Sequence, residues 1–229
     1  MDQQREALRE HFARRLIELE PASILDVGAG AGALVRSLVG QGVPAVGLEP
    51  TRTTGDGSDE TPRYPRVQAT ASALPVAEAG VDWVTLRHVP HHLPDLAGAL
   101  REAARAARTG LLIAEPWFEE TLPDQRFALR ADRWLKRHDR LQGLYHGDAL
   151  DGEALQAALP ATLRGPREVE TYRPERPWTP DDLEREARRA TAGLPPTPEE
   201  QRELDALLDV AERGRMSLPG TLILTVRKG

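Results

Sequence analysis

Glycines and carboxylates recur at fixed spacing near the start of the chain, and these residue types can hold a ligand. Asp26 comes first, Glu49 comes last, and between them every second residue of the run 28–32 is glycine. Glycines let the backbone turn tightly and let its N–H groups come close to a ligand. A helix that starts after the turn adds partial positive charge, which favours a carboxylate or a phosphate. A carboxylate at the position of Glu49 can accept both hydroxyls of a ribose, so the pattern predicts a site for a ligand that carries a nucleoside.

The surrounding elements must bring these residues to one edge of a sheet. Residues 23–27 and 45–48 are short apolar runs and are predicted to be strands, while residues 33–39 between them have helical spacing. Two strands separated by one helix form a βαβ unit, in which the strands are parallel and the crossover is right-handed. An amphipathic helix is predicted before them, at residues 3–19.

The rest of the chain continues the alternation of strands and helices up to about residue 115. A loop rich in Thr, Gly, Asp and Pro is expected at residues 51–66. Further strands are expected at residues 67–69, 81–86, 111–114, 169–172 and 221–226. Further helices are expected within residues 95–107, 117–160 and 181–215, the last interrupted at 193–196. This order predicts an α/β fold with an open, doubly wound and mostly parallel sheet.

The glycine run alone does not identify the ligand, because its spacing also satisfies a relaxed dinucleotide-binding pattern. Asp26 lies two residues before the first glycine, where a carboxylate can attract an amino group. A dinucleotide has no such group near its pyrophosphate. The chain also ends in two strands around a helical stretch, and not in a second βαβαβ half.

Three segments in order resemble the class I S-adenosylmethionine-dependent methyltransferases. They are ILDVGAGAGALVRSLVGQGVPAVGLEP, ALPVAEAGVDWVTLRHVPHHLPD and ALREAARAARTGLLIAEPW, and the resemblance extends over residues 22–117. The subgroup that they resemble acts on small molecules and includes the ubiquinone and menaquinone biosynthesis methyltransferases. The resemblance implies a seven-stranded Rossmann-like sheet with a C-terminal antiparallel hairpin. It also implies S-adenosylmethionine as cofactor and methyl transfer to a small-molecule acceptor.

The resemblance assigns cofactor roles by position. The glycine loop would meet the methionine part of the cofactor, Asp26 would anchor that loop and attract the ammonium group, and Glu49 would hold the ribose. Similar proteins usually carry an aspartate near the adenine amino group, and here Thr70 stands at that position. A threonine hydroxyl is a weaker acceptor than a carboxylate. The cofactor-binding residues implied in this way are Asp26, Gly28, Ala29, Gly30, Gly32, Glu49, Pro50, Thr70, Ala71, Arg87 and His88, the last two through backbone atoms.

Three histidines, His88, His91 and His92, follow the fourth expected strand. Three imidazoles can bind zinc, but Pro90 lies among these residues and the spacing suits neither a regular strand nor a helix. We therefore expect no metal. His91 and His92 remain candidates for a general base or for orienting the acceptor, with a structural role in the loop as the alternative.

Residues 117–160 differ in amino-acid composition from the other helical stretches, and we expect them to form a helical insertion that partly covers the substrate. The predicted acceptor-binding residues are His92, Trp117, Arg133 and Trp134. Four arginines fall on one face of the expected helix between residues 126 and 137. They suit an anionic acceptor or, as the alternative, a solvated face paired with acids. The tryptophans equally suit a protein core.

Length and composition limit the number of domains, the kinds of partner and the compartment that these predictions allow. The 229 residues suit a single domain, 1–229 with the insertion. The net charge of −6 disfavours a nucleic-acid partner, and the absence of cysteine excludes disulfides and thiolate sites. No apolar run is long enough for a membrane span and the N-terminus has no signal-peptide core, so we expect a cytoplasmic enzyme with no membrane partner. Two alternatives remain open, a non-catalytic methyltransferase-like protein and an NAD-dependent oxidoreductase.

Overall fold

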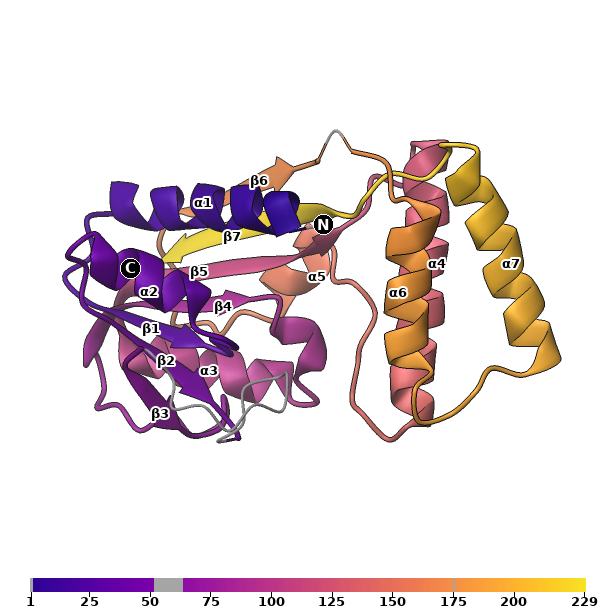
Figure 1. Ribbon diagram of the computed structural model, residues 1–229. Helices are drawn as coiled ribbons and strands as arrows, with labels where there is room; N and C mark the ends of the chain where they lie inside the picture. Colours follow the sequence, from indigo (N-terminus) through magenta and orange to yellow (C-terminus); the bar gives the residue numbers. More distant parts are fainter. Residues whose placement is uncertain (1, 52–63, 175) are drawn as a thin grey trace.

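The computed structural model describes residues 2–51, 64–174 and 176–229 (Figure 1). Within them, seven strands form one mixed sheet in the order β3-β2-β1-β4-β5-β7-β6. The strands β1 to β5 pair in parallel, and β7 runs antiparallel between β5 and β6. Their bounds are β1 Ile24–Val27, β2 Ala45–Glu49, β3 Arg66–Gln68, β4 Val81–Arg87, β5 Ala107–Trp117, β6 Arg167–Tyr172 and β7 Gly220–Arg227. The expected doubly wound sheet with a C-terminal antiparallel pair is confirmed.

Helices cover both faces of this sheet, since alternate residues of each strand point to opposite sides. Leu25 and Val27 of β1 belong to the core beneath α3 (Leu96–Ala106) and α5 (Gly152–Ala157). Ile24 belongs to the core on the other face, beneath α1 (Asp2–Glu18) and α2 (Ala33–Gly40). Burial on both faces explains why the parallel strands are continuous apolar runs in the sequence.

Three further helices form a layer of their own beyond one edge of the sheet (Figure 1). They are α4 (Pro123–Leu141), α6 (Pro180–Ala190) and α7 (Pro198–Glu212), and they share a separate apolar core. The carboxyl ends of β4 and β5 point toward this helical layer in Figure 1. The three helices and their shared core are called the helical layer below.

The expected insertion at 117–160 therefore divides into two parts. Its first helix, α4, lies in the helical layer, whereas its second helix, α5, packs on the sheet through the buried Leu155. The helices α6 and α7 complete the layer from much later in the chain. Thr197 caps α7 with the reciprocal contacts of a capping box to Glu200, which explains its sharp start after the proline-rich break.

Two sequence predictions differ from the structure or lie outside it. The strand β5 is longer than the expected 111–114, because β7 pairs with it from Gly110 to Trp117. The loop expected at 51–66 lies largely outside the described residues. Among the helices that are described, none combines the length and apolar character needed to cross a membrane.

Candidate functional site

The glycine loop joins β1 to α2 at the carboxyl edge of the sheet. Gly28, Gly30 and Gly32 all have positive φ angles, of 71°, 55° and 73°. A side chain on Gly28 would collide with Val89, and one on Gly32 would collide with the ring of Tyr64. Above Gly30, by contrast, and apart from its chain neighbours, no atom of the described residues lies within 4 Å of the position that a Cβ would take. The loop is thus closed at both ends and open to an approaching ligand at its centre.

Asp26 is buried beneath this loop, with an exposed fraction of 2%. Its Oδ1 accepts a hydrogen bond of 2.7 Å from the hydroxyl of Thr85, on the neighbouring strand β4. Burial raises the pKa of Asp26 to about 6, against the opposing effects of the Thr85 hydrogen bond and the Arg87 charge. The second oxygen, Oδ2, is buried and has no hydrogen-bond partner among the described residues. A cationic group of a ligand would supply that partner.

Glu49 ends β2, next to the loop, as its position in the sequence predicts. Its Oε1 accepts a hydrogen bond from the backbone N–H of Gly30. Tyr64 packs over the same loop and donates from its hydroxyl to the carbonyl oxygen of Gly30 at 2.7 Å. The carboxylate and the open backbone of Gly30 therefore lie side by side, which is the arrangement that a ribose with two hydroxyls requires.

The other residues assigned to the cofactor lie around this centre. Ala29 is buried in the loop, and Pro50, directly after Glu49, is exposed. Thr70 is exposed and its hydroxyl lies 3.2 Å from that of Ser72, while Ala71 is partly buried. A neutral, solvated hydroxyl thus stands where an acidic residue was expected from the family pattern.

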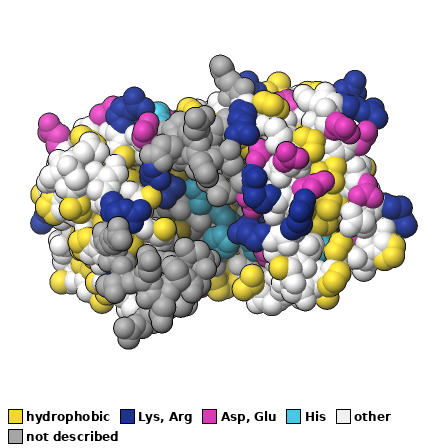
Figure 2. Space-filling view, viewed as in Figure 1, with side chains coloured by type: hydrophobic (Ala, Val, Ile, Leu, Met, Phe, Trp, Pro, Cys, Tyr) yellow, Lys and Arg dark blue, Asp and Glu magenta, His cyan; other side chains and the backbone are white. Residues whose placement is uncertain are grey.

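A cavity of about 570 Å³ opens between the sheet edge and the helical layer. Figure 2 shows the hollow between the two parts, with histidine side chains inside it. Arg87, His88 and Pro116 line it from the ends of β4 and β5, and Lys136 lines it from α4. Its size lies within the range of small-molecule sites. Because β1 and β4 are adjacent, the cavity and the glycine loop lie at the same edge of the sheet, although the cavity lining includes Arg87 and His88 and no residue of the loop itself.

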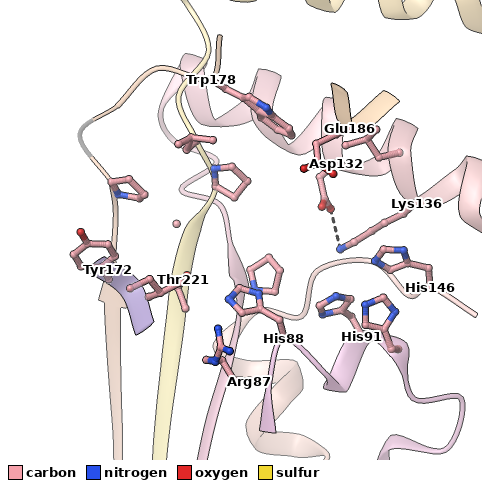
Figure 3. A pocket seen from close by; sticks show the side chains of 18 of the residues that line it. Arg87, His88, His91, Asp132, Lys136, His146, Tyr172, Trp178, Glu186 and Thr221 are labelled. Atoms are coloured by element: carbon pink, nitrogen blue, oxygen red, sulfur yellow. Dashed lines mark ion pairs between the residues drawn. The ribbon is translucent and has the colours of Figure 1, made fainter. Parts of the chain in front are cut away.

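The ends of β4 and β5 hold unusual groups at the cavity wall (Figure 3). His88 has a positive φ of 55°, a strained conformation for a residue other than glycine. Arg87 lines the cavity, and its Nε is buried without a hydrogen-bond partner among the described residues. Burial lowers the pKa of Arg87, and the Asp26 carboxylate counteracts this shift. The side chain of Arg87, not only its backbone, is therefore part of the site.

His91 and Glu115 form a buried pair at the base of the cavity. The Nδ1 of His91 and the Oε2 of Glu115 are 2.7 Å apart. Burial raises the pKa of Glu115 to about 8 and lowers that of His91 to about 3. At pH 7 the imidazole is uncharged and the carboxyl group is mostly protonated, so the contact is a hydrogen bond between neutral groups.

Lys136 and Asp132 face the histidines from α4. Their Nζ and Oδ2 atoms are 2.9 Å apart, and Figure 3 marks this ion pair. Burial raises the pKa of Asp132, and the charge of Lys136 opposes this effect. The pair belongs to a charged wall of the cavity, to which Asp139 on α4 and Glu186 and Arg189 on α6 also contribute.

The predicted acceptor-binding residues do not all reach the cavity. His92 lines it, but Trp134, Arg133 and Trp117 do not. Trp134 is 1% exposed in the core of the helical layer, where its Nε1 donates to the carbonyl oxygen of Glu200 at 3.0 Å. Arg133 is exposed, and Trp117 packs against the sheet core. The structure therefore does not bring these three side chains to the cavity, and for Trp134 the reason is that α4 turns it toward α7.

The arginine face of α4 has a structural partner instead. Arg137 lies 2.6 Å from the carboxylate of Glu203 on α7, which agrees with the alternative of a face paired with acids. Sequence reasoning also missed several cavity residues. These are Asp132, Lys136, Asp139, His146, Tyr172 and Thr221, which come from four separate segments. No local motif marks them, since the fold alone brings them together.

The comparisons with known proteins agree with this architecture. Residues 25–114 match the family described as Methyltransferase domain, which corresponds to less than half of the chain. That segment contains the glycine loop, Glu49 and the histidines that follow β4. No curated protein sequence gives a significant match.

Solved structures match over nearly the whole chain at low sequence identity. A protein proposed to be a methyltransferase from Bacillus halodurans has a TM-score of 0.60 at 18% identity, with 94% of this chain and 98% of that chain covered. A SAM-dependent methyltransferase from Archaeoglobus fulgidus has a TM-score of 0.55 at 17% identity, with 95% and 94% covered. The cyclase SpnF has a TM-score of 0.54 at 20% identity, with 90% and 75% covered. The chain thus has the Rossmann-like fold of the class I methyltransferases.

Proposed function

We propose that the protein transfers a methyl group from S-adenosylmethionine to a small-molecule acceptor. The observation that carries this proposal is the glycine loop with the Glu49 carboxylate at its Gly30 N–H, at the same edge of the sheet as a cavity of about 570 Å³. A cofactor site and an acceptor site therefore share one edge of the sheet. The family match of residues 25–114 supports the same reaction class.

Each part of the cofactor has a suitable group in this chain. The unpartnered Oδ2 of the buried Asp26 suits the ammonium of the methionine part. The open backbone of Gly30 suits a close approach, and Glu49 suits the two ribose hydroxyls. Thr70 and Ala71 would border the adenine. The loop fits S-adenosylmethionine better than a dinucleotide, whose pyrophosphate a buried carboxylate would repel.

The cofactor supplies an electrophilic methyl group on a positive sulfur. The protein's own task is to align the acceptor and to exclude water, and holding two reactants in line can lower a barrier by about 7–11 kcal/mol. The helical layer supplies the wall that faces the sheet edge, with Lys136 and Asp132 on it. Burial lowers the pKa of His91 to about 3, which makes it a weak base, so His92, which also lines the cavity, is the better candidate of the two to take a proton from an acceptor.

A small-molecule acceptor follows from the dimensions of the cavity and from the resemblance to the ubiquinone and menaquinone branch. Arg87, Lys136 and Arg189 line the cavity together with Asp132, Asp139 and Glu186, so polar groups surround an apolar floor. That lining suits a compact polar molecule with at least one apolar face. A nucleic acid would need an open basic surface, and the net charge of −6 argues against one.

Other activities on this fold provide the alternative. SpnF, which has a similar fold, is described as a cyclase, and fold alone does not determine function. The exposed Thr70 also stands where similar proteins carry an acidic partner for the adenine, which favours a weakly binding or non-catalytic methyltransferase-like protein. Titration calorimetry with S-adenosylmethionine, S-adenosylhomocysteine and NAD tests which cofactor binds and how tightly. Tighter binding of NAD would refute the cofactor assignment.

Glu49 provides the sharpest test of the site. Loss of its charge-assisted hydrogen bonds is worth about 1.5–3 kcal/mol, so Glu49→Ala should weaken cofactor binding roughly ten- to a hundredfold. Glu153, an exposed glutamate on α5, is a matched control, and Glu153→Ala should leave the affinity unchanged. Unchanged affinity in Glu49→Ala would mean that the ribose lies elsewhere. Release of S-adenosylhomocysteine in the presence of candidate acceptors then identifies the substrate.

A further inference from the structure

Three histidines from two distant segments meet at the wall of the cavity. His91 and His92 belong to the short 3₁₀ turn Pro90–His92 after β4, and His146 follows α4. One nitrogen from each ring lies within 4.8 Å of the other two. The ring centre of His92 is 4.3 Å from those of both His91 and His146, and the latter two are 5.1 Å apart. The three rings therefore enclose one small volume.

We propose that His91, His92 and His146 together bind one divalent transition-metal ion of the zinc type. Imidazole is a preferred ligand of Zn²⁺ and of its neighbours Co²⁺ and Ni²⁺. In a tetrahedral zinc site with Zn–N distances of about 2.0–2.1 Å, the nitrogens lie about 3.4 Å apart. Side-chain rotation of the exposed His92 and the partly buried His146 can close the set to that distance.

Two of the three rings have a carboxyl group as hydrogen-bond partner on one nitrogen. The Nδ1 of His91 contacts Glu115 at 2.7 Å, and the Nδ1 of His146 contacts Asp139 at 2.6 Å. Burial lowers the pKa of His92, and the backbone of Tyr145, which lies near its ring, opposes this larger effect. Metal-binding histidines almost always have such a carboxylate or carbonyl partner on the second ring nitrogen. In His91 and His146, the Nε2 atoms are thus left for a ligand.

The charges around the cluster suit a divalent cation. Glu115 and Asp139 contact the histidines directly, and Asp132 pairs with Lys136 at 2.9 Å, which compensates the charge of the lysine. The Asp139 carboxylate therefore remains to balance part of the double positive charge, while Glu115, mostly protonated at pH 7, is a neutral partner. The backbone supports the arrangement as well, because the N–H of Gly147 donates to the carbonyl of His91 at 2.7 Å and ties the two segments together.

The alternative is a purely structural cluster, in which His146 anchors the segment after α4 to the turn. Exposure separates the two cases. His91 is 6% exposed, but His92 is an exposed residue, and all three rings line the cavity. A structural anchor has no need of an exposed imidazole at the cavity wall, whereas a metal site with an open position does.

The site would also select the acceptor, and this part rests on the proposed methyl transfer. Three protein ligands in a tetrahedral zinc site leave a fourth position, which here opens to the cavity. A hydroxyl group bound there loses its proton to solvent near neutral pH. The oxygen then forms a bond to the methyl carbon as the carbon–sulfur bond breaks, with S-adenosylhomocysteine as the leaving group. We therefore assign an oxygen acceptor, an alcohol or phenol.

The test of the metal site requires neither cofactor nor acceptor. The full chain, purified without a polyhistidine tag and stripped with a chelator, is titrated calorimetrically with Zn²⁺. It is then titrated with Co²⁺, whose visible absorption reports tetrahedral nitrogen coordination. We expect one equivalent of metal, with a rise in the melting temperature. Failure of the wild-type protein to bind either metal at equimolar ratio would overturn the proposal.

Variants locate the site. His146→Ala and His92→Ala should both abolish equimolar binding, and His92 is exposed enough that its removal should leave the fold intact by circular dichroism. Asp139→Asn, which changes only the orienting partner, should weaken binding roughly ten- to a hundredfold. His11→Ala is the control, since His11 lies on α1 and pairs with Glu170, away from the cluster.

The results separate this proposal from the proposed function. Equal metal binding in His146→Ala and wild type would mean that the ion binds elsewhere, and the three-histidine site would be wrong. Metal binding that depends on the three histidines, in a protein that does not bind S-adenosylmethionine, would keep the site and reject methyl transfer. Binding of S-adenosylmethionine without binding of metal would keep the proposed methyl transfer and reject the metal site.

Discussion

Replacement of Asp26 by asparagine should stabilise the free protein at neutral pH, although it should weaken cofactor binding. Asp26 is buried beneath the glycine loop, and burial raises its pKa to about 6 from its ordinary value of 3.8. A carboxyl group whose pKa is higher in the folded state binds its proton more tightly there. Its contribution to stability is therefore lost as pH rises from the unfolded pKa to the folded pKa, that is, from about 4 to 6.

The magnitude follows from the two pKa values. At 1.36 kcal/mol per pKa unit, the raised pKa of Asp26 lowers the free energy of unfolding by about 3 kcal/mol at pH 7 and by about 1 kcal/mol at pH 4.5, relative to a side chain that stays neutral. The asparagine of the variant carries no charge at either pH, and its side-chain oxygen can accept the same hydrogen bond from Thr85. The advantage of Asp26→Asn over wild type should thus be about 2 kcal/mol larger at pH 7 than at pH 4.5.

Urea unfolding of both proteins at the two pH values measures this difference. Other titrating groups are common to the two proteins, so their contributions cancel in the comparison. A difference between the proteins that does not change with pH would refute the reasoning, because it would mean that Asp26 carries no buried charge. With cofactor bound, the ammonium group should offset the cost, and affinity for S-adenosylmethionine should fall in Asp26→Asn.

Four further outcomes follow from particular contacts. Gly32→Ala should lower the melting temperature and weaken cofactor binding, because Gly32 has a φ of 73° and a Cβ there would strike Tyr64; an unchanged melting temperature would contradict this. Trp134→Ala should destabilise by about 3–5 kcal/mol in chemical unfolding, and an altered cofactor affinity would argue against its place in the helical layer. Arg133→Ala should change stability by less than about 0.5 kcal/mol and leave turnover unchanged, since Arg133 is exposed. Lys136→Met should cost about 3–5 kcal/mol at pH 7 by leaving Asp132 without its cation, and equal stability to wild type would exclude a buried ion pair.

The sheet and the glycine loop could be predicted because their signals are local. A strand buried on both faces is an apolar run, and a loop that needs positive φ at alternate positions requires glycine. The length of β5 could not be predicted in this way. Its last residues, Glu115, Pro116 and Trp117, do not continue the apolar run, and they belong to the strand because β7 pairs with them, at Pro116 with Thr221 and at Trp117 with Gly220.

The cavity could be predicted only in part, because its residues are brought together by packing. Arg87 and His92 follow a recognisable strand, so their place at the sheet edge was accessible from the sequence. Trp134 was not, since an aromatic residue within an arginine-rich helix suits both a cavity and a core, and the packing of α7 decides between them. His146 is more than fifty residues from His92, and no spacing rule connects the two.

The connections between the sheet and the helical layer have a consequence for how molecules enter the cavity. The chain crosses between the two parts four times, at 118–122, 142–151, 173–179 and 213–219. Prolines stiffen or bound three of these tethers, but the tether 142–151 contains none and has glycines at 143 and 147. This connection, which the sequence makes the most flexible of the four, carries His146. An ion bound to His146 and to the two histidines of the opposite wall would link this connection to the sheet edge. Binding or loss of the ion would then change how far the entrance of the cavity can open.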